Sequence, residues 1–233
     1  MTILLHELAL DRGILSSPYC WMVRFALGHK GLDYAAAATS FTGIPAIAGG
    51  GQKMVPVLDD GGKLIADSWA IAEHLEAAYA DRPSLFGDAQ GKSFARFVLA
   101  TFGANVMRPA MRVVMNEVYK KVQPQDRAYY QESRSQRIGM SIEEFTSAPI
   151  AERLAGFRTA LEPVRAVLKN QKFLAGSAPM YPDYIAAGIL LWARAASPEH
   201  VLAKDDPILP WFEAMLALYP RIAKESTRTW DGP

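Results

Sequence analysis

Residues 16–27, SSPYCWMVRFAL, decide how the chain begins to fold. A serine followed by a proline is a common helix start, because proline is tolerated in the first turn and serine caps free backbone N–H groups. The helix is expected over residues 18–30. In a dithiol redox helix this start reads Cys-Pro-Tyr-Cys. Here Ser17 stands where the attacking cysteine would be, and Cys20 is the one sulfur that remains.

The segments around this helix predict a small α/β domain. The apolar run at residues 3–8 is typical of a buried strand, and residues 34–41 are expected to form a second strand. Residues 54–65 hold two apolar runs around an Asp-Gly-Gly turn, which is the pattern of a hairpin. Residues 67–79 place apolar side chains at helical spacing. The predicted order is therefore β-α-β, hairpin, α.

The rest of the chain predicts helices alone. Residues 80–91 are rich in turn formers, so we expect one domain at 1–80, a linker at 81–91 and a second domain at 92–233. Helices are expected over residues 92–119, 125–146, 150–170, 183–195 and 208–219. The fold class is thus an α/β domain followed by an all-α bundle.

Composition argues against several function classes. The 233 residues carry 25 Lys and Arg against 24 Asp and Glu, so no net field attracts nucleic acid or an anionic membrane. The cationic residues between Arg108 and Arg137 alternate with acids, which is typical of a solvated helix face. One cysteine allows no internal disulfide, and the four histidines show no ligand spacing. With no leader pattern and no apolar run near the roughly 20 residues that span a bilayer, we expect a cytoplasmic protein without metal.

Ser17 lies where it could act on a thiolate that another molecule supplies. A helix N-terminus favours a thiolate through its unpaired N–H groups and dipole. A serine hydroxyl without a base is a poor nucleophile, but it can donate a hydrogen bond. Lowering a thiol pKa of about 8.5 by about two units takes about 2.7 kcal/mol, and one hydrogen bond to a charged group supplies about 1.5–3 kcal/mol. A purely capping role for Ser16 or Ser17, and a buried apolar role for Cys20, remain open on this reasoning.

Three separated pieces resemble the serine-type glutathione transferases at that family's spacing. They are residues 17–27, the VPVL run at 55–58, and Asp67-Ser68 before the next helix. The resemblance implies a thioredoxin-like N-terminal domain that binds glutathione as co-substrate, an all-α domain that completes a hydrophobic co-substrate site, and a homodimer. Within the family, residues 41–44 and the PQDR run at 124–127 are most similar to bacterial glutathione-dependent β-etherases.

The resemblance also implies roles for single residues. Ser17 would stabilise the glutathione thiolate, with Ser16 as the alternative donor. Lys53 is expected to bind the glycyl carboxylate, with Gln52 or a residue near Thr42 as alternatives.

The remaining implied contacts lie before the hairpin, after it and in the second half. Val55, ahead of a cis Pro56, would pair its backbone with the tripeptide like an added strand. Asp67 and Ser68 would hold the γ-glutamyl end at the start of their helix. The wall of the hydrophobic co-substrate site is expected to comprise Tyr19, Met22, Phe102, Met107, Met111 and Trp192.

The predicted reaction is attack by the glutathione thiolate on an electrophilic carbon of an apolar, aromatic compound, in detoxification or aromatic catabolism. Ether cleavage would displace a phenolate, and conjugation would displace a halide or add to an alkene. Two alternatives are a non-catalytic protein of this fold and a thiol redox protein that uses Cys20. One departure from the family pattern is Met180, where a capping Ser, Thr or Asn usually precedes the Asp183 position. Its helix is expected to lack a side-chain cap worth about 1 kcal/mol.

Overall fold

A four-stranded sheet forms the centre of the N-terminal half in the computed structural model, which describes residues 2–227. The strands β1 (Ile3–Leu8), β2 (Tyr34–Thr39), β3 (Val57–Asp60) and β4 (Lys63–Ala66) lie in the order β2-β1-β3-β4. β1 pairs with β2 in parallel and with β3 antiparallel, and β3 and β4 form the expected hairpin. β2 and β4 are the edge strands, which leaves β1 and β3 as the buried centre of the sheet.

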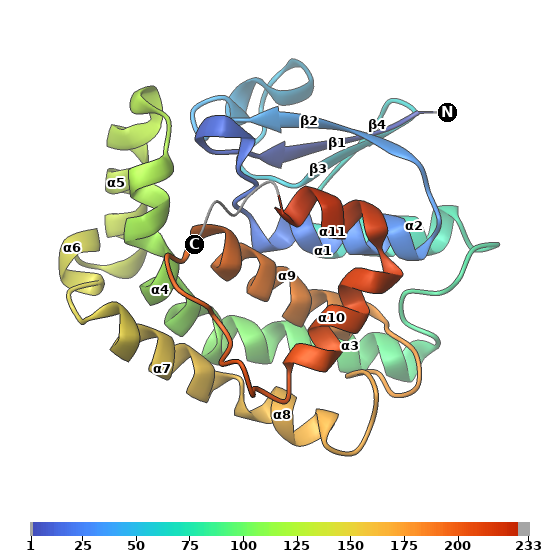
Figure 1. Ribbon diagram of the computed structural model, residues 1–233. Helices are drawn as coiled ribbons and strands as arrows, with labels where there is room; N and C mark the ends of the chain where they lie inside the picture. Colours follow the sequence, from blue (N-terminus) through green and yellow to red (C-terminus); the bar gives the residue numbers. More distant parts are fainter. Residues whose placement is uncertain (1, 228–233) are drawn as a thin grey trace.

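Two helices cover one face of this sheet, as Figure 1 shows below the strands. α1 (Pro18–His29) follows β1, and α2 (Ser68–Ala78) follows the hairpin. α1 is buried almost throughout because the sheet lies on one side of it and the C-terminal helices lie on the other. The predicted order β-α-β, hairpin, α is confirmed. Sequence analysis missed two short 3-10 segments, Asp11–Gly13 and Ile44–Gly49.

The C-terminal half is entirely helical, but three of the predicted helices are each broken into two. Pro109 lacks the N–H that would bond to the carbonyl of Asn105, and the first helix ends at that residue. Pro163 breaks the third predicted helix in the same way, and Gly139, with φ of 78°, ends the second. The helices are α3 (Ala89–Asn105), α4 (Met107–Lys121), α5 (Arg127–Ile138), α6 (Ile142–Phe145), α7 (Ile150–Ala160), α8 (Glu162–Leu168), α9 (Tyr181–Ala196), α10 (Leu209–Leu218) and α11 (Pro220–Thr227). Within residues 2–227, none of them is long and apolar enough to cross a membrane.

α9 is the central helix of this half and packs against α1, α3 and α4. A methyl group added at Gly188 would lie 2.7 Å from the carbonyl oxygen of Pro18, so glycine permits the close approach of α9 to the start of α1. Met180 provides no side-chain cap, as expected. Instead the buried Asp183 carboxylate accepts hydrogen bonds from the Met180 N–H at 3.1 Å and from Trp211 Nε1 at 2.9 Å. Asp183 thereby joins the start of α9 to α10.

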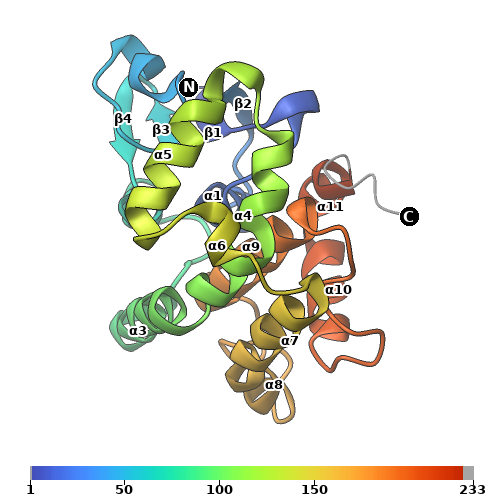
Figure 2. The same ribbon diagram turned by 90° about the vertical axis from the view of Figure 1, so that its left-hand side faces the viewer.

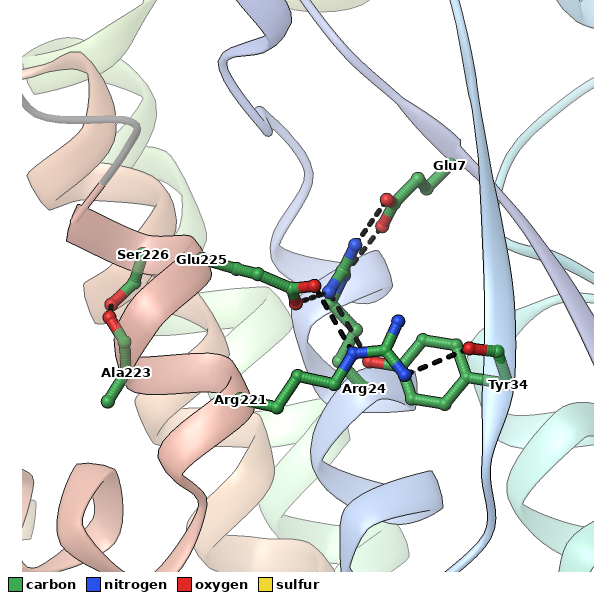
Figure 3. Close-up of polar contacts among 7 residues, drawn as sticks. All are labelled: Glu7, Arg24, Tyr34, Arg221, Ala223, Glu225 and Ser226. Atoms are coloured by element: carbon green, nitrogen blue, oxygen red, sulfur yellow. Dashed lines mark hydrogen bonds and ion pairs between the residues drawn. The ribbon is translucent and has the colours of Figure 1, made fainter.

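A charged network holds α11 against the N-terminal half (Figure 3). The Arg24 guanidinium is buried between two carboxylates: Nε donates to Glu7 at 2.7 Å, and a terminal nitrogen pairs with Glu225 of α11. Arg221 donates to the Tyr34 carbonyl at 2.9 Å and lies over the Tyr34 ring. The last described helix is therefore fastened to both β2 and α1.

Candidate active site

A cavity of about 480 Å³ lies between the sheet domain and the C-terminal helices. The N-terminal half contributes the starts of α1 and α2 and the segment before β3, and the C-terminal half contributes α4, α5 and α9. α5 stands across the ends at which β1 and β2 terminate, as the two views in Figures 1 and 2 show. The lining residues are Leu8, Ser16, Ser17, Pro18, Tyr19, Phe41, Ile44, Lys53, Met54, Val55, Pro56, Asp67, Ser68, Met107, Met111, Met115, Val118, Tyr129, Tyr130, Arg134, Arg137 and Trp192.

Ser17 is the N-cap of α1 and opens to the cavity. Its Oγ accepts a hydrogen bond from the Cys20 backbone N–H at 3.3 Å. A hydroxyl that accepts such a bond keeps its own proton, so it can still donate to a ligand. The capping role and the donor role that sequence analysis set against each other are therefore compatible in one side chain.

Ser16 lies next to Ser17 in the same wall and is buried to the same degree, with 6% of each residue exposed. Its backbone N–H donates to the Leu8 carbonyl at 3.3 Å, which ties this segment to the end of β1. Its Oγ has no hydrogen-bond partner in the described part of the chain. Both candidate donors thus face the cavity, but only Ser17 lies at the helix terminus.

The segment before β3 presents the unpaired backbone of Val55 to the cavity, while the Pro56 carbonyl accepts the Asp67 N–H at 3.3 Å. The peptide bond from Val55 to Pro56 is cis, as predicted from the resemblance. Sheet pairing begins only at Val57, and Val55 itself has no backbone hydrogen-bond partner in residues 2–227. An extended peptide in the cavity could therefore pair with Val55 as a short added strand.

Asp67 and Ser68 form the N-terminus of α2 at the cavity. Asp67 has φ of 80°, a conformation that costs a non-glycine residue about 1–3 kcal/mol and is concentrated at functional sites. Its Oδ1 accepts the N–H groups of Trp69 and Ala70 at 2.9 and 3.1 Å. The second carboxylate oxygen faces no donor within residues 2–227. The site therefore combines a free carboxylate oxygen with the positive end of a helix dipole.

Lys53 lies on the cavity wall, whereas its two alternatives do not. Gln52 is absent from the lining, and the N–H and hydroxyl of Thr42 both donate to the buried Asp126 carboxylate, at 3.0 and 2.5 Å. The Phe41 N–H donates to the other oxygen of Asp126 at 3.0 Å. Asp126 thus joins the loop after β2 to the start of α5, and Thr42 has no donor left for a ligand.

Four of the predicted co-substrate residues line the cavity, namely Tyr19, Met107, Met111 and Trp192. Met22 and Phe102 do not, and these two predictions are corrected. Met22 is one turn beyond Tyr19 on α1, where it is fully buried beneath α9 against Gly188. Phe102 belongs to α3, ahead of the break that redirects the chain into α4, and its ring is buried in the core.

Sequence analysis missed the contribution of α5 and part of α4. Met115 and Val118 continue the stripe of Met107 and Met111 along one face of α4, so helical spacing could have found them. The α5 residues Tyr129, Tyr130, Arg134 and Arg137 had no such signal. The prediction that cationic residues up to Arg137 lie on a solvated face is wrong for Arg134, which is half-buried in the cavity wall.

Cys20 is unsuited to a redox role. Only 2% of the residue is exposed, and burial raises the pKa of its thiol to about 12. The reactive form of a cysteine is the thiolate, which is then scarce at neutral pH. In the described residues, no three His, Cys, Asp or Glu side chains are grouped so that they could hold a metal ion.

The sequence matches two family descriptions, one for each half. Residues 13–83 match "Glutathione S-transferase, N-terminal domain" and residues 93–213 match "Glutathione S-transferase, C-terminal domain". The chain belongs to the glutathione S-transferase family. The predicted fold, a thioredoxin-like N-terminal domain followed by an all-α bundle, is thereby confirmed.

Solved structures share the whole fold of this chain. A glutathione S-transferase from Ceriporiopsis subvermispora in complex with glutathione superposes with a TM-score of 0.77 at 18% identity, over 95% of this chain and 97% of that one. Glutathione transferase GSTFuA3 from Phanerochaete chrysosporium gives a TM-score of 0.74 at 20% identity, over 100% and 99%. Glutathione S-transferase U7 from Arabidopsis thaliana is 30% identical over 105 residues, which is 44% of this chain and 46% of that relative. That similarity spans less than half of the curated relative's length.

Proposed function

We propose that the protein is a glutathione transferase in which Ser17 stabilises the thiolate of bound glutathione for attack on an apolar, aromatic electrophile. The observation that carries this proposal is the position of Ser17. Its Oγ caps α1 and lies in the cavity wall, where the hydroxyl can turn from the Cys20 thiol, its hydrogen-bonding neighbour in the helix, to a ligand. A hydrogen bond to a thiolate contributes about 1.5–3 kcal/mol, and the helix terminus adds about 0.3–1 kcal/mol. Together they lower a thiol pKa by one to about three units.

The rest of the N-terminal wall fits the tripeptide part by part. The cysteinyl backbone would pair with the free backbone of Val55. The γ-glutamyl carboxylate would bind at the N-terminus of α2 beside Ser68, and its ammonium at the unpaired oxygen of Asp67. The glycyl carboxylate would bind Lys53. In this proposed pose the sulfur would lie at the start of α1.

The reaction then needs only positioning and an apolar wall. The thiolate attacks an electrophilic carbon, a C–S bond forms, and the bond from that carbon to the leaving group breaks with its electron pair. The apolar part of the electrophile would pack against the methionines of α4 and the rings of Tyr19 and Trp192. Methionine adapts to varied shapes, which suits an aromatic substrate of variable substitution.

A finer proposal is β-aryl ether cleavage, which follows from the sequence resemblance to β-etherases. The same attack would then displace a phenolate, and the Ser17 site would be unchanged. A β-aryl ether with a chromogenic phenol as leaving group tests it directly. Release of the phenol that depends on both glutathione and Ser17 would support ether cleavage, and its absence beside active halide displacement would limit the protein to conjugation.

We also propose that the protein is a homodimer. Phe94 and Phe97 on α3 and Leu64 on the edge strand β4 are exposed, with Phe97 exposed by 66%. Phe94 and Phe97 lie three residues apart on one face of α3, and neighbouring exposed apolar side chains of this kind mark interaction surfaces. Size-exclusion chromatography with light scattering should give a dimer for the wild type and for Leu218→Glu, and a monomer for Phe97→Glu. A monomeric wild type at micromolar concentration would overturn this proposal.

The catalytic proposal is tested by conjugation kinetics of two matched serine variants. Ser17→Ala should lower kcat/KM for an activated halobenzene by roughly tenfold to a hundredfold, the value of one hydrogen bond to a charged group. Ser16→Ala removes the neighbouring hydroxyl and should change it less than about threefold. The reverse pattern would make Ser16 the donor. If the wild type and both variants show no glutathione-dependent activity, the non-catalytic alternative is favoured.

A further inference from the structure

The charges that line the cavity do not match those of glutathione alone. Three cationic side chains reach the lining, Lys53, Arg134 and Arg137, against the single carboxylate of Asp67. Glutathione brings two carboxylates and one ammonium. In the proposed pose the ammonium meets Asp67, one carboxylate meets the helix terminus of α2, and the other meets Lys53. Both arginines of α5 are then left without an anion.

Arg134 is held in place by aromatic rings rather than by a carboxylate. Its guanidinium carbon lies 5.0 Å from the centre of the Phe41 ring and 5.1 Å from that of Tyr130. One terminal nitrogen donates to Ser133 Oγ at 3.3 Å. The Tyr130 hydroxyl is a further polar partner of this side chain, but no ion pair of it is found within residues 2–227, although a guanidinium carries five N–H donors.

The acidic groups of α5 and of its start have other partners: Glu132, two residues before Arg134, accepts a hydrogen bond from the Gln136 side-chain amide at 3.3 Å. Asp126 at the start of α5 accepts three hydrogen bonds from Phe41 and Thr42. The Tyr130 hydroxyl, on the same helix as Arg134, donates to the carbonyl of Met115 at 3.2 Å. The described protein therefore offers Arg134 no counterion.

A partly buried guanidinium without a counterion costs free energy when no anion is bound. Burial lowers the pKa of the Arg134 guanidinium, and the positive charge of Arg137 one turn away adds to that effect. A partly buried charge is stable when it is paired, and the fork of an arginine matches a carboxylate with two parallel hydrogen bonds. An anionic ligand at this end of the cavity would supply that pair.

We propose that the electrophilic co-substrate carries a carboxylate, which Arg134 binds in the cavity with Arg137 beside it. The proposal rests on the proposed transferase function, whose site it completes. The aromatic body of the co-substrate would lie against the methionines of α4, and its carboxylate would lie between Phe41 and Tyr130 on the α5 side. The preferred substrates are therefore aromatic acids rather than neutral aromatics.

The test compares a chlorodinitrobenzene with the chlorodinitrobenzoate that differs from it by one carboxylate. Each kcat/KM is divided by the rate constant of the uncatalysed reaction with glutathione, which removes the effect of the carboxylate on intrinsic reactivity. The wild type should favour the benzoate. Arg134→Met and Arg137→Met should each reduce that preference, Arg134→Met by about tenfold or more. Arg127→Met removes a charge from the same helix outside the cavity lining and should leave the preference unchanged.

Calorimetry provides a readout that does not depend on turnover. The glutathione conjugate of the benzoate should bind the wild type more tightly than the conjugate of the neutral compound, and Arg134→Met should abolish the difference. Arg134→Lys keeps the positive charge but loses the planar guanidinium, so it should retain part of the difference in affinity between the two conjugates.

The possible failures are distinguishable. If Arg134→Met raises KM for glutathione and affects both electrophiles equally, the arginine binds the glycyl carboxylate and the proposal is overturned. Equal preference of the wild type for the two electrophiles would overturn it as well. If neither compound is conjugated and glutathione does not bind, the proposed function itself has failed.

Discussion

Arg24 and Arg134 are both withdrawn from solvent, and they differ in what surrounds them. Arg24 lies between the carboxylates of Glu7 and Glu225, and only 3% of it is exposed. Burial would lower its pKa, but the hydrogen bonds and charge of Glu7 outweigh burial and raise it. The Arg134 guanidinium contacts two aromatic rings and one serine hydroxyl but no carboxylate, and burial lowers its pKa. A closed ion pair holds two parts of the fold together, whereas an unpaired guanidinium at a cavity is available to a ligand.

The largest effect expected from this comparison is on stability. Arg24→Met leaves the Glu7 carboxylate buried without its partner, which costs about 3–5 kcal/mol. Urea unfolding followed by circular dichroism measures the loss. Arg221→Met is the comparison variant, because Arg221 is 44% exposed: its pair with Glu225 is worth about 0–1 kcal/mol, and its hydrogen bond to the Tyr34 carbonyl about 0.5–1.5 kcal/mol, so the loss should be smaller. Equal losses in the two variants would contradict the structural role assigned to Arg24.

Arg134→Met should behave in the opposite way in the empty protein. The substitution removes a partly buried charge that has no counterion and keeps the apolar stem between Phe41 and Tyr130. We expect the free energy of unfolding to stay within about 1 kcal/mol of the wild type or to rise. The same urea series measures it. A loss as large as that of Arg24→Met would show that Arg134 is structural and would remove the contrast between the two arginines.

The smallest effect is expected at Cys20, a third buried ionisable side chain, which has no ion pair within residues 2–227 and belongs to the core. Because burial raises the pKa of its thiol to about 12, native protein at pH 8 should resist iodoacetamide, and protein unfolded in urea should react quickly. Mass spectrometry counts the modification. Cys20→Ala should also keep most of the transferase activity, since the backbone N–H of residue 20 still bonds to Ser17 Oγ and loss of the thiol leaves the Ser17 proton to the ligand. Fast alkylation of the native thiol with loss of activity would revive the redox alternative.

Local sequence signals predicted the N-terminal half well. Ser17 before Pro18 specified the start of α1, and the Asp-Gly-Gly turn specified the hairpin, because each depends on residues close together in the chain. The broken helices could also have been predicted. Pro109 and Pro163 each remove one helical hydrogen bond, and those signals were present in the sequence.

The α5 wall could not be predicted from the sequence. Its position depends on Asp126, which binds backbone groups of Phe41 and Thr42 more than eighty residues earlier in the chain. The spacing of apolar residues along the chain cannot predict a contact between residues so far apart in the sequence. The prediction that Met22 lines the co-substrate site is wrong for a related reason. Helical spacing places Met22 one turn from Tyr19, but the close approach of α9 at Gly188 buries Met22 and leaves Tyr19 at the cavity.

The central claim is that Ser17 stabilises a glutathione thiolate, and the ultraviolet absorbance of that thiolate tests it most directly. Glutathione bound to the wild type, to Ser17→Ala and to Ser16→Ala is titrated across pH, and the apparent pKa of its thiol is read from the thiolate band. We predict a pKa well below that of free glutathione for the wild type and for Ser16→Ala, and a value raised by about one to two units in Ser17→Ala. Bound glutathione that ionises like the free tripeptide in all three proteins would contradict the account.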